Sequence, residues 1–282
     1  MVDTATARRL YQRLEPLHAF VYFSPEANLR YQQLGLAGQD GYFASRAAAM
    51  GAVGSEVVVA TFFNFQPALV RAALPGAWDV TSPREVLEAR LDGADETLRR
   101  VLGDLVDHPD LAEVVDLART AAEACSPQGR PLYAAHAALA WPEPLHLQLF
   151  HAVTLLREHR GDGHVAALTL ENLNHGDVLV THAASEAMGL PEEILQLTRG
   201  FTDEEWQAAK GSLRDRGILD AEGRLTAEGT ALRQRIEDRT DDAALPPWQA
   251  LGDDGCARLL ELSAPFSRAV VKSGVFGGRA RG

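Results

Sequence analysis

The sequence TDEEWQAAKGSLRDRGILDAEGRLTAEG, residues 202–229, carries the strongest structural signal in this chain. Thr202 followed three residues later by a glutamate has the capping-box spacing that begins a helix, and we expect this helix to end at Gly217. Residues 218–220 and 224–226 have the character of two short strands separated by a turn. The predicted order is therefore a helix followed by a two-stranded β-wing.

Two further helices are expected before this stretch. Residues 175–188 form a predicted helix stopped by Gly189, and residues 191–198 form a short one. A tight turn at 199–201 separates the short helix from the next. Helix, tight turn, helix and ribbon is the order of elements in a winged helix-turn-helix.

Residues 175–240 are similar to a known group of regulators. Leu213 and the runs 216–219 and 223–229 resemble the winged-helix segment of MarR-type regulators, where a leucine-bearing recognition helix precedes a short strand and an LTxxG step begins the next helix. Over nearly its full length the chain also resembles the SalK-like helix-turn-helix proteins of bacteria. This second resemblance is carried by residues 15–18, 22–23, 41–46, 60–65, 151–164, 240–241 and 246–248. It implies a helix-turn-helix fold without implying a reaction.

Helix signals also dominate the rest of the chain. Ser24 and Ser82 each precede a proline at the first helical position, and leucines recur at helical spacing after Ser82. We predict an all-α protein: a multi-helix N-terminal domain followed by a winged helix-turn-helix with a short two-stranded β-wing. The predicted divisions are a ligand-binding helical domain at 1–173, the winged helix-turn-helix at 174–244, a helical segment for packing or dimerisation at 245–276 and a flexible tail at 277–282.

Composition is typical of a soluble globular protein. Of 282 residues, 46% are hydrophobic and 23% are charged. No run approaches the roughly 18–20 apolar residues of a membrane span, so no membrane association is expected. Two distant cysteines are typical of a reducing compartment, which predicts a cytoplasmic protein. The net charge of −12 opposes general attraction to nucleic acid or anionic lipid, although it allows a local basic patch.

The predicted recognition helix begins with acids. Residues 203–205 are Asp-Glu-Glu, which would meet phosphates with the wrong sign, and residues 191–240 hold eleven acids against eight bases. Either the winged helix binds DNA, or it is a packing or partner-binding module. The contacts predicted for the first alternative are Lys210, Arg214, Arg216 and Arg224.

Histidines and arginines gather in one part of the sequence. Seven of nine histidines lie between residues 136 and 182, and REHRGDGH at 157–164 is the densest stretch. We expect the helix that begins at Pro144 to stop near Gly161, and a loop there would form either an anion pocket or a structural polar hinge. The predicted ligand contacts in this region are Arg157, Arg160, Asp162 and His164, of which Asp162 also caps the next helix.

An enzyme would use the same cluster for proton transfer. In that case the predicted acid–base residues are His151, Glu158 and His159. A mixed metal site of His159, Asp162 and His164 has no familiar ligand spacing, so we expect no metal. The nucleotide-binding patterns GxGxxG and GxxxxGK[ST] are absent, and we expect no cofactor.

Aromatic residues form a second candidate region. Nine of the fifteen phenylalanines and tyrosines lie between residues 20 and 65. Such a run is either ordinary core or a hydrophobic cavity with a few polar groups. Tyr42, Arg46 and Asn64 are the polar groups that would contact a ligand there.

These observations predict a small-molecule-binding winged-helix protein of transcription-regulator type, with an anionic or aromatic ligand. The alternative is an enzyme whose winged helix is only scaffold. A homodimer is expected, with DNA as a further possible partner. The predicted dimer surface is an amphipathic run at 256–271, which could instead pack on its own domain; its apolar residues are Leu259, Leu260, Leu262, Phe266 and Val270.

Overall fold

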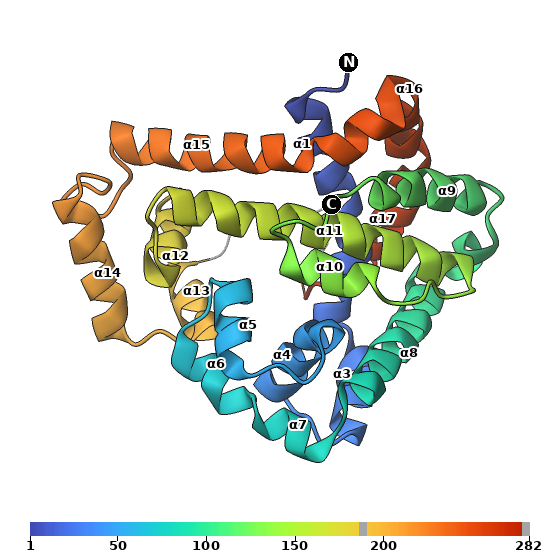
Figure 1. Cartoon of the computed structure of the whole chain (residues 1–282), viewed down its shortest axis with the longest axis horizontal. Coiled ribbons are helices and arrows are strands. Elements are labelled where there is room, and N and C mark those ends of the chain that lie inside the picture. The colour runs from blue at the N-terminus through green and yellow to red at the C-terminus, as the bar shows by residue number, and fades with distance from the viewer. Residues whose placement is uncertain (186–190, 278–282) are drawn as a thin grey trace.

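The computed structural model describes residues 1–185 and 191–277, and the long helix α11 runs through the centre of the molecule (Figure 1). The α-helices are α1 Thr4–Leu14, α2 Pro16–Ala19, α3 Pro25–Gln33, α4 Gln39–Ala47, α5 Ser55–Phe62, α6 Pro67–Ala73, α7 Gly76–Val80, α8 Pro83–Leu102, α9 Asp110–Glu123, α10 Pro131–Ala137, α11 Leu145–Leu170, α12 His175–Ala184, α13 Glu192–Arg199, α14 Asp203–Asp215, α15 Ala227–Ala244, α16 Pro246–Leu262 and α17 Ala264–Lys272. Three short 3₁₀ helices are Phe20–Tyr22, Ala48–Met50 and Gly103–Asp107.

Local capping signals determine where many of these helices begin. Ser24 accepts a hydrogen bond from the amide of Ala27 at the start of α3, as predicted. Ser82 and Thr202 each form a complete capping box, with α8 and α14 respectively. The prediction of an all-α body is therefore confirmed.

The predicted β-wing is wrong. No β-strand forms within residues 1–185 and 191–277, and a single antiparallel bridge joins Leu219 to Leu225. Thr226 is already the N-cap of α15, since its hydroxyl accepts from the amide of Gly229. The predicted second strand therefore keeps only two residues between Gly223 and Thr226, which is too short for a ladder of hydrogen bonds.

The predicted end of a helix near Gly161 is also wrong, because α11 continues to Leu170. Two helix-interior glycines cost about 1 kcal/mol each relative to alanine. Close packing explains the glycine at position 163, because a Cβ there would lie 2.5 Å from Nη1 of Arg130. The guanidinium of Arg130 donates to the carbonyl of His159 in α11 and to that of Ala243 in α15. The second glycine, Gly161, faces a cavity described below.

Asp162 does not cap a following helix. Its carboxylate accepts from the amides of Leu132 (3.0 Å) and Tyr133 (2.9 Å), so it caps α10 from a distant part of the chain. Burial raises the pKa of Asp162 to about 6, although these amide hydrogen bonds oppose the shift.

Two clusters of buried hydrophobic side chains form the interior. The larger one joins α1–α11 with α16 and α17. The smaller one lies under α12, α13 and α14 and includes Trp206 and Leu213, together with residues from the end of α11 and from α15. The predicted division at residue 173 stays a prediction, since α11 contributes to both clusters.

The apolar run predicted for dimerisation packs within its own chain. Leu259, Leu262, Phe266 and Val270 are all buried in the larger cluster, and Leu260 packs against it. This structure therefore offers no support for a dimer through that face.

Across the described part of the chain, no single helix is long and apolar enough to cross a membrane. One bent pair, 39–50 with 55–62, passes that test by length and composition only. The expected end of α12 at Met188-Gly189 and nearly all of the predicted flexible tail lie outside the described residues.

Candidate anion-binding site

A cavity of about 170 Å³ lies between α4, the α5–α6 connection, α11 and the end of α13. We call it the arginine cavity. Its lining residues are Tyr42, Arg46, Thr61, Phe62, Asn64, Phe65, Leu132, Arg157, Glu158, Gly161, Asp162, His164, Val165 and Arg199. Six of the seven predicted ligand contacts meet here, although their sequence positions span more than 120 residues. The seventh, Arg160, lies in an adjoining cleft.

Arg46 presents a buried positive charge to this cavity. Its side chain is 8% exposed, and no carboxylate of the described chain lies within ion-pair distance. Nη1 donates to the hydroxyl of Tyr42 at 3.0 Å, and the guanidinium lies 4.0 Å above the ring centre of Phe62. Nε has no hydrogen-bond partner. A guanidinium does not lose its proton, so the charge and an unused donor both remain.

Asn64 reaches the cavity from a strained turn. Phe63 has φ +57° and ψ −50°, and the amide of Asn64 donates to the carbonyl of Phe62 at 2.6 Å. This is the rare form of γ-turn, with a positive φ at the central residue. The side-chain oxygen of Asn64 is buried and has no hydrogen-bond partner. Strain and unsatisfied buried polar atoms of this kind concentrate at functional sites.

Arg199 completes the arginine cavity, and no feature of the sequence pointed to it. It is the last residue of α13 and lies 4.8 Å above the ring centre of Phe65, with no carboxylate partner among the ion pairs of the described residues. Burial lowers its pKa from the ordinary arginine value. Only the packing of α13 against residues 65–66 brings this charge to the site.

The α11 wall of the cavity contributes charges of both signs. Arg157 pairs with Glu158 at 2.7 Å, and Glu158 is 2% exposed. Glu158 Oε1 lies 3.8 Å from Nε2 of His18, whose pKa burial lowers well below its usual value, so His18 is neutral at pH 7. The nearby guanidiniums, with Arg157 foremost, hold the pKa of Glu158 below normal despite its burial. With two arginines lacking acids, the cavity has a net positive character.

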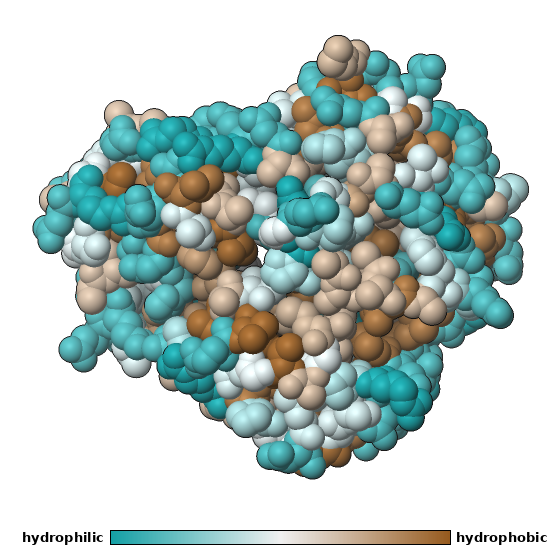
Figure 2. Space-filling view, in the orientation of Figure 1, coloured by the Kyte–Doolittle hydropathy of each residue, from teal (hydrophilic) through white to brown (hydrophobic). Residues whose placement is uncertain are grey.

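A larger cleft of about 980 Å³ opens next to the arginine cavity and shares Asn64, Arg157, Gly161, His164 and Arg199 with it. Figure 2 shows the surface hollowed between the lobe of α12–α14 and the rest of the molecule. Six arginines and a single glutamate line this cleft: Arg8, Arg157, Arg160, Arg199, Arg224 and Arg233, with Glu237. The cleft is thus basic in a chain whose net charge is −12.

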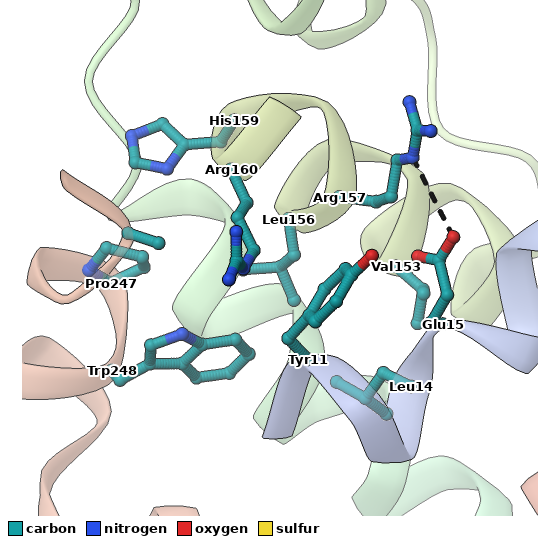
Figure 3. A pocket seen from close by; sticks show the side chains of 11 residues that line it. Tyr11, Leu14, Glu15, Val153, Leu156, Arg157, His159, Arg160, Pro247 and Trp248 are labelled. Carbon is teal, nitrogen blue, oxygen red and sulfur yellow. Dashed lines mark ion pairs between the residues drawn. The ribbon is translucent and has the colours of Figure 1, made fainter. Parts of the chain in front are cut away.

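Most of the cleft arginines have acidic partners in the cleft or beside it. Arg8 and Arg160 both pair with Asp241, and Arg233 pairs with Glu237 at 3.3 Å. Figure 3 shows Arg160 beside Tyr11, whose ring centre lies 4.5 Å from its guanidinium. The pocket drawn there has a volume of about 20 Å³, enough for a single water. Arg160 therefore has a structural pairing that Arg46 and Arg199 lack.

The residues predicted for catalysis are not brought together. His151 lies in a pocket on another side of α11, Glu158 lines the arginine cavity, and His159 lies near the ring of Tyr133 at 5.3 Å. His164 contacts Thr240 through Nδ1 at 2.9 Å. In the described part of the chain, no group of three or more His, Cys, Asp or Glu side chains is placed to hold a metal ion.

The helices α12, α13 and α14 follow one another in the order expected of a helix-turn-helix. α13 ends at Arg199 and is capped by Gly200, which has φ +80°, and three residues separate α13 from α14. A sequence model described as a helix-turn-helix family matches residues 7–277. The chain belongs to this helix-turn-helix family. No curated protein and no solved structure matches it.

The helix-turn-helix residues predicted to contact DNA have carboxylate partners in three of four cases. Lys210 pairs with Glu192 at 2.5 Å and Arg216 with Asp177 at 3.0 Å. Arg224 pairs with Asp220 and Glu222 in the short loop before α15. Arg214 is exposed and donates through Nε to the carbonyl of Asp220 at 3.3 Å. That these four residues contact DNA stays a prediction.

Proposed function

We propose that this helix-turn-helix protein is a ligand-responsive regulator whose arginine cavity binds a small anion carrying an aromatic group. The family supports a DNA-binding, regulator-type protein. The observation that carries the ligand is the pair Arg46 and Arg199, two guanidiniums without carboxylate partners among the described residues that line one cavity. Burying an unpaired charge is costly, and a bound anion offsets that cost.

The aromatic rings around the two guanidiniums favour a ligand that carries an aromatic group. Phe62 and Phe65 each stack against one arginine, and the ring of Tyr42 lies 5.7 Å from that of Phe65 and accepts a hydrogen bond from Arg46 at its hydroxyl. An aromatic body can pack on these rings while its anionic group accepts hydrogen bonds from the guanidiniums. The unpartnered oxygen of Asn64 can in turn accept one hydrogen bond from a donor on the ligand.

The cavity is joined directly to the helix-turn-helix. The amide of Gln66 donates to the carbonyl of Arg199 at 2.9 Å, and its side chain donates to Glu205 of α14 at 2.7 Å. Gly200 packs against Leu69 so closely that a Cβ there would lie 3.0 Å from it. An anion that draws Arg199 toward Arg46 would therefore act on the turn between α13 and α14, which is the physical route of the proposed response.

Binding of phenyl phosphate, with phenol as the uncharged control, tests the ligand half of this proposal. Isothermal titration is expected to show binding of phenyl phosphate and a loss of at least tenfold in Arg46→Met and in Arg199→Met, because each removes a charge-assisted hydrogen bond. Arg119→Met, on the outside of α9, is the matched control. Native mass spectrometry of the purified protein would identify a retained anion. No binding of phenyl phosphate and no retained mass would contradict the proposal.

DNA binding is tested separately from the ligand. A fragment from the promoter region of the protein's own gene is expected to shift in a salt-dependent manner, and less so with Arg214→Ala. Absence of a shift at low salt would favour a partner-binding role for α14.

A further inference from the structure

A second pocket, which shares no lining residue with the arginine cavity, lies between α8, α10, the 139–142 connection and α11. α8 and α10 both pack against α11 in this part of the molecule (Figure 1). Its volume is about 310 Å³. We call it the Arg90 pocket. At about 30 Å³ for each water-sized group, it holds roughly ten such groups.

The walls of the Arg90 pocket are mainly apolar. Leu87, Leu91, Leu139, Pro142 and Phe150 form most of the lining. Figure 2 shows hydrophobic side chains gathered over α8 on this face. Apolar walls with a few polar groups are the usual make-up of a small-molecule site.

Arg90 supplies the charge of the pocket. Its side chain is 4% exposed, and no carboxylate of the described residues forms an ion pair with it. Nη1 is buried without a hydrogen-bond partner, and the rings of Tyr22 and Phe150 lie 5.4 and 5.5 Å from the guanidinium. The charge of Glu158 acts on Arg90 without a direct contact, and Glu158 is already paired with Arg157. A permanently charged group with an unused donor therefore borders an apolar space.

Two neutral imidazoles complete the polar part of the pocket. Burial lowers the pKa of His136 to about 3 and that of His151 to about 4, so both are uncharged at pH 7. Nε2 of His151 is buried without a hydrogen-bond partner, and its ring lies 4.7 Å from that of Trp141. At the exposed rim, Arg84 and Glu88 pair at 2.6 Å and neutralise each other. The pocket thus offers one positive charge, and not the several that a phosphate would call for.

We propose that the Arg90 pocket binds an apolar monocarboxylate of about ten non-hydrogen atoms, with the carboxylate on Arg90 and the hydrocarbon against the leucines of α8. The neutral imidazole of His151, protonated at Nε2, donates a further hydrogen bond to the carboxylate. The lining of this site has no residue in common with that of the arginine cavity, and it is mainly apolar with one buried charge.

Octanoate, which has ten non-hydrogen atoms, is the probe, and octan-1-ol is its uncharged control. Isothermal titration of the full chain is expected to show octanoate binding that Arg90→Met weakens at least tenfold. Arg84→Gln at the rim and Arg199→Met in the arginine cavity are expected to bind octanoate as the parent protein does. Arg90→Met removes an unpaired buried charge, so its melting temperature is expected to be no lower than that of the parent.

Leu87→Trp provides a second test that leaves Arg90 in place. The indole occupies the apolar part of the pocket, and octanoate binding is expected to be lost while the helical circular-dichroism signal is kept. Absence of octanoate binding, equal binding of octan-1-ol, or binding that survives both Arg90→Met and Leu87→Trp would overturn the proposal. Binding lost in Arg199→Met but kept in Arg90→Met would place octanoate in the arginine cavity and would overturn it equally.

Discussion

The arginine cavity and the helix-turn-helix segment hold basic residues in two different states. In the cavity, Arg46 and Arg199 stack on phenylalanine rings and have no acidic partner within the described chain. In the helix-turn-helix, Lys210, Arg216 and Arg224 each pair with a carboxylate of the same chain. Counting charges in the sequence treats these two groups alike, yet only the first leaves its positive charge available to a ligand.

The same contrast extends to histidine. Residues 191–240 contain none, whereas the α10–α12 region contains histidines that burial keeps neutral. The polar groups of the N-terminal body thus depend on burial for their charge state, and those of the helix-turn-helix depend on exposed or half-exposed ion pairs. Four measurements test this distinction.

Acid is expected to have the largest effect. Burial lowers the pKa of five histidines to values of about 3 or 4; these residues are His136, His151, His159, His164 and His182. Below pH 6.5 the unfolded chain binds protons at these sites and the folded chain does not, so stability falls as pH falls, by up to about 1.4 kcal/mol per pH unit for each histidine. Asp162, with its raised pKa, acts in the opposite direction between about pH 4 and 6 but is a single group.

Urea denaturation at pH 7.5, 6.5 and 5.5 measures this effect. We expect the free energy of unfolding to decrease by several kcal/mol over that range. The fluorescence of Trp141, which lies against His151, should change at a higher pH than that of Trp206 in the helix-turn-helix. A stability that does not depend on pH would show that these imidazoles are not buried as neutral groups.

Glu158→Gln is expected to have the next largest effect. The carboxylate is 2% exposed and is the closer partner of Arg157, at 2.7 Å, so its removal leaves the half-buried guanidinium with Glu15, at 3.9 Å, as its counter-charge. We expect a loss of about 2–3 kcal/mol in the free energy of unfolding, because a buried charge-assisted hydrogen bond is lost. Glu192→Gln, which removes the partially exposed partner of Lys210, is the matched control and should cost about 1 kcal/mol or less. Equal losses in the two variants would remove the distinction between the two regions.

Arg216→Met tests a paired arginine of the helix-turn-helix. Its partner Asp177 is 2% exposed and also accepts from the amide of Asn174 at the start of α12. Loss of the guanidinium leaves a buried carboxylate without its ion pair, and we expect a destabilisation of about 1–3 kcal/mol. Thermal unfolding measures this change, and Arg216→Met with Asp177→Asn should recover part of it. No recovery in the double variant would mean that the two side chains act separately.

Arg199→Met is expected to have the smallest effect on stability. No carboxylate loses a partner, and methionine can still pack on Phe65. We expect the free energy of unfolding without ligand to change by less than about 1 kcal/mol in either direction. A destabilisation as large as that of Arg216→Met would show that Arg199 has a structural role instead of a role toward a ligand.

Much of the fold follows from local signals. The capping boxes at Ser82 and Thr202 and the proline starts of α3 and α8 act within one helical turn, so the chain specifies them without help from distant residues. The order of helices at 191–217 is confirmed for the same reason. Six of the residues predicted to contact a ligand also lie together in the structure, and three of them, Arg157, Asp162 and His164, come from neighbouring turns of α11.

Tertiary packing decided what these local signals could not. α11 continues through Gly163, where Arg130 and Ala243 of α15 fill the space beside it, and Asp162 caps α10, whose first residue lies 31 positions earlier. The wing is short because Thr226 is used as a helix cap. Arg199 reaches the cavity only because α13 docks on Gln66. The helices depend on contacts between near neighbours in the chain, so the sequence alone determines them. Which charges remain without partners depends on contacts between distant segments, and only the folded chain makes those contacts.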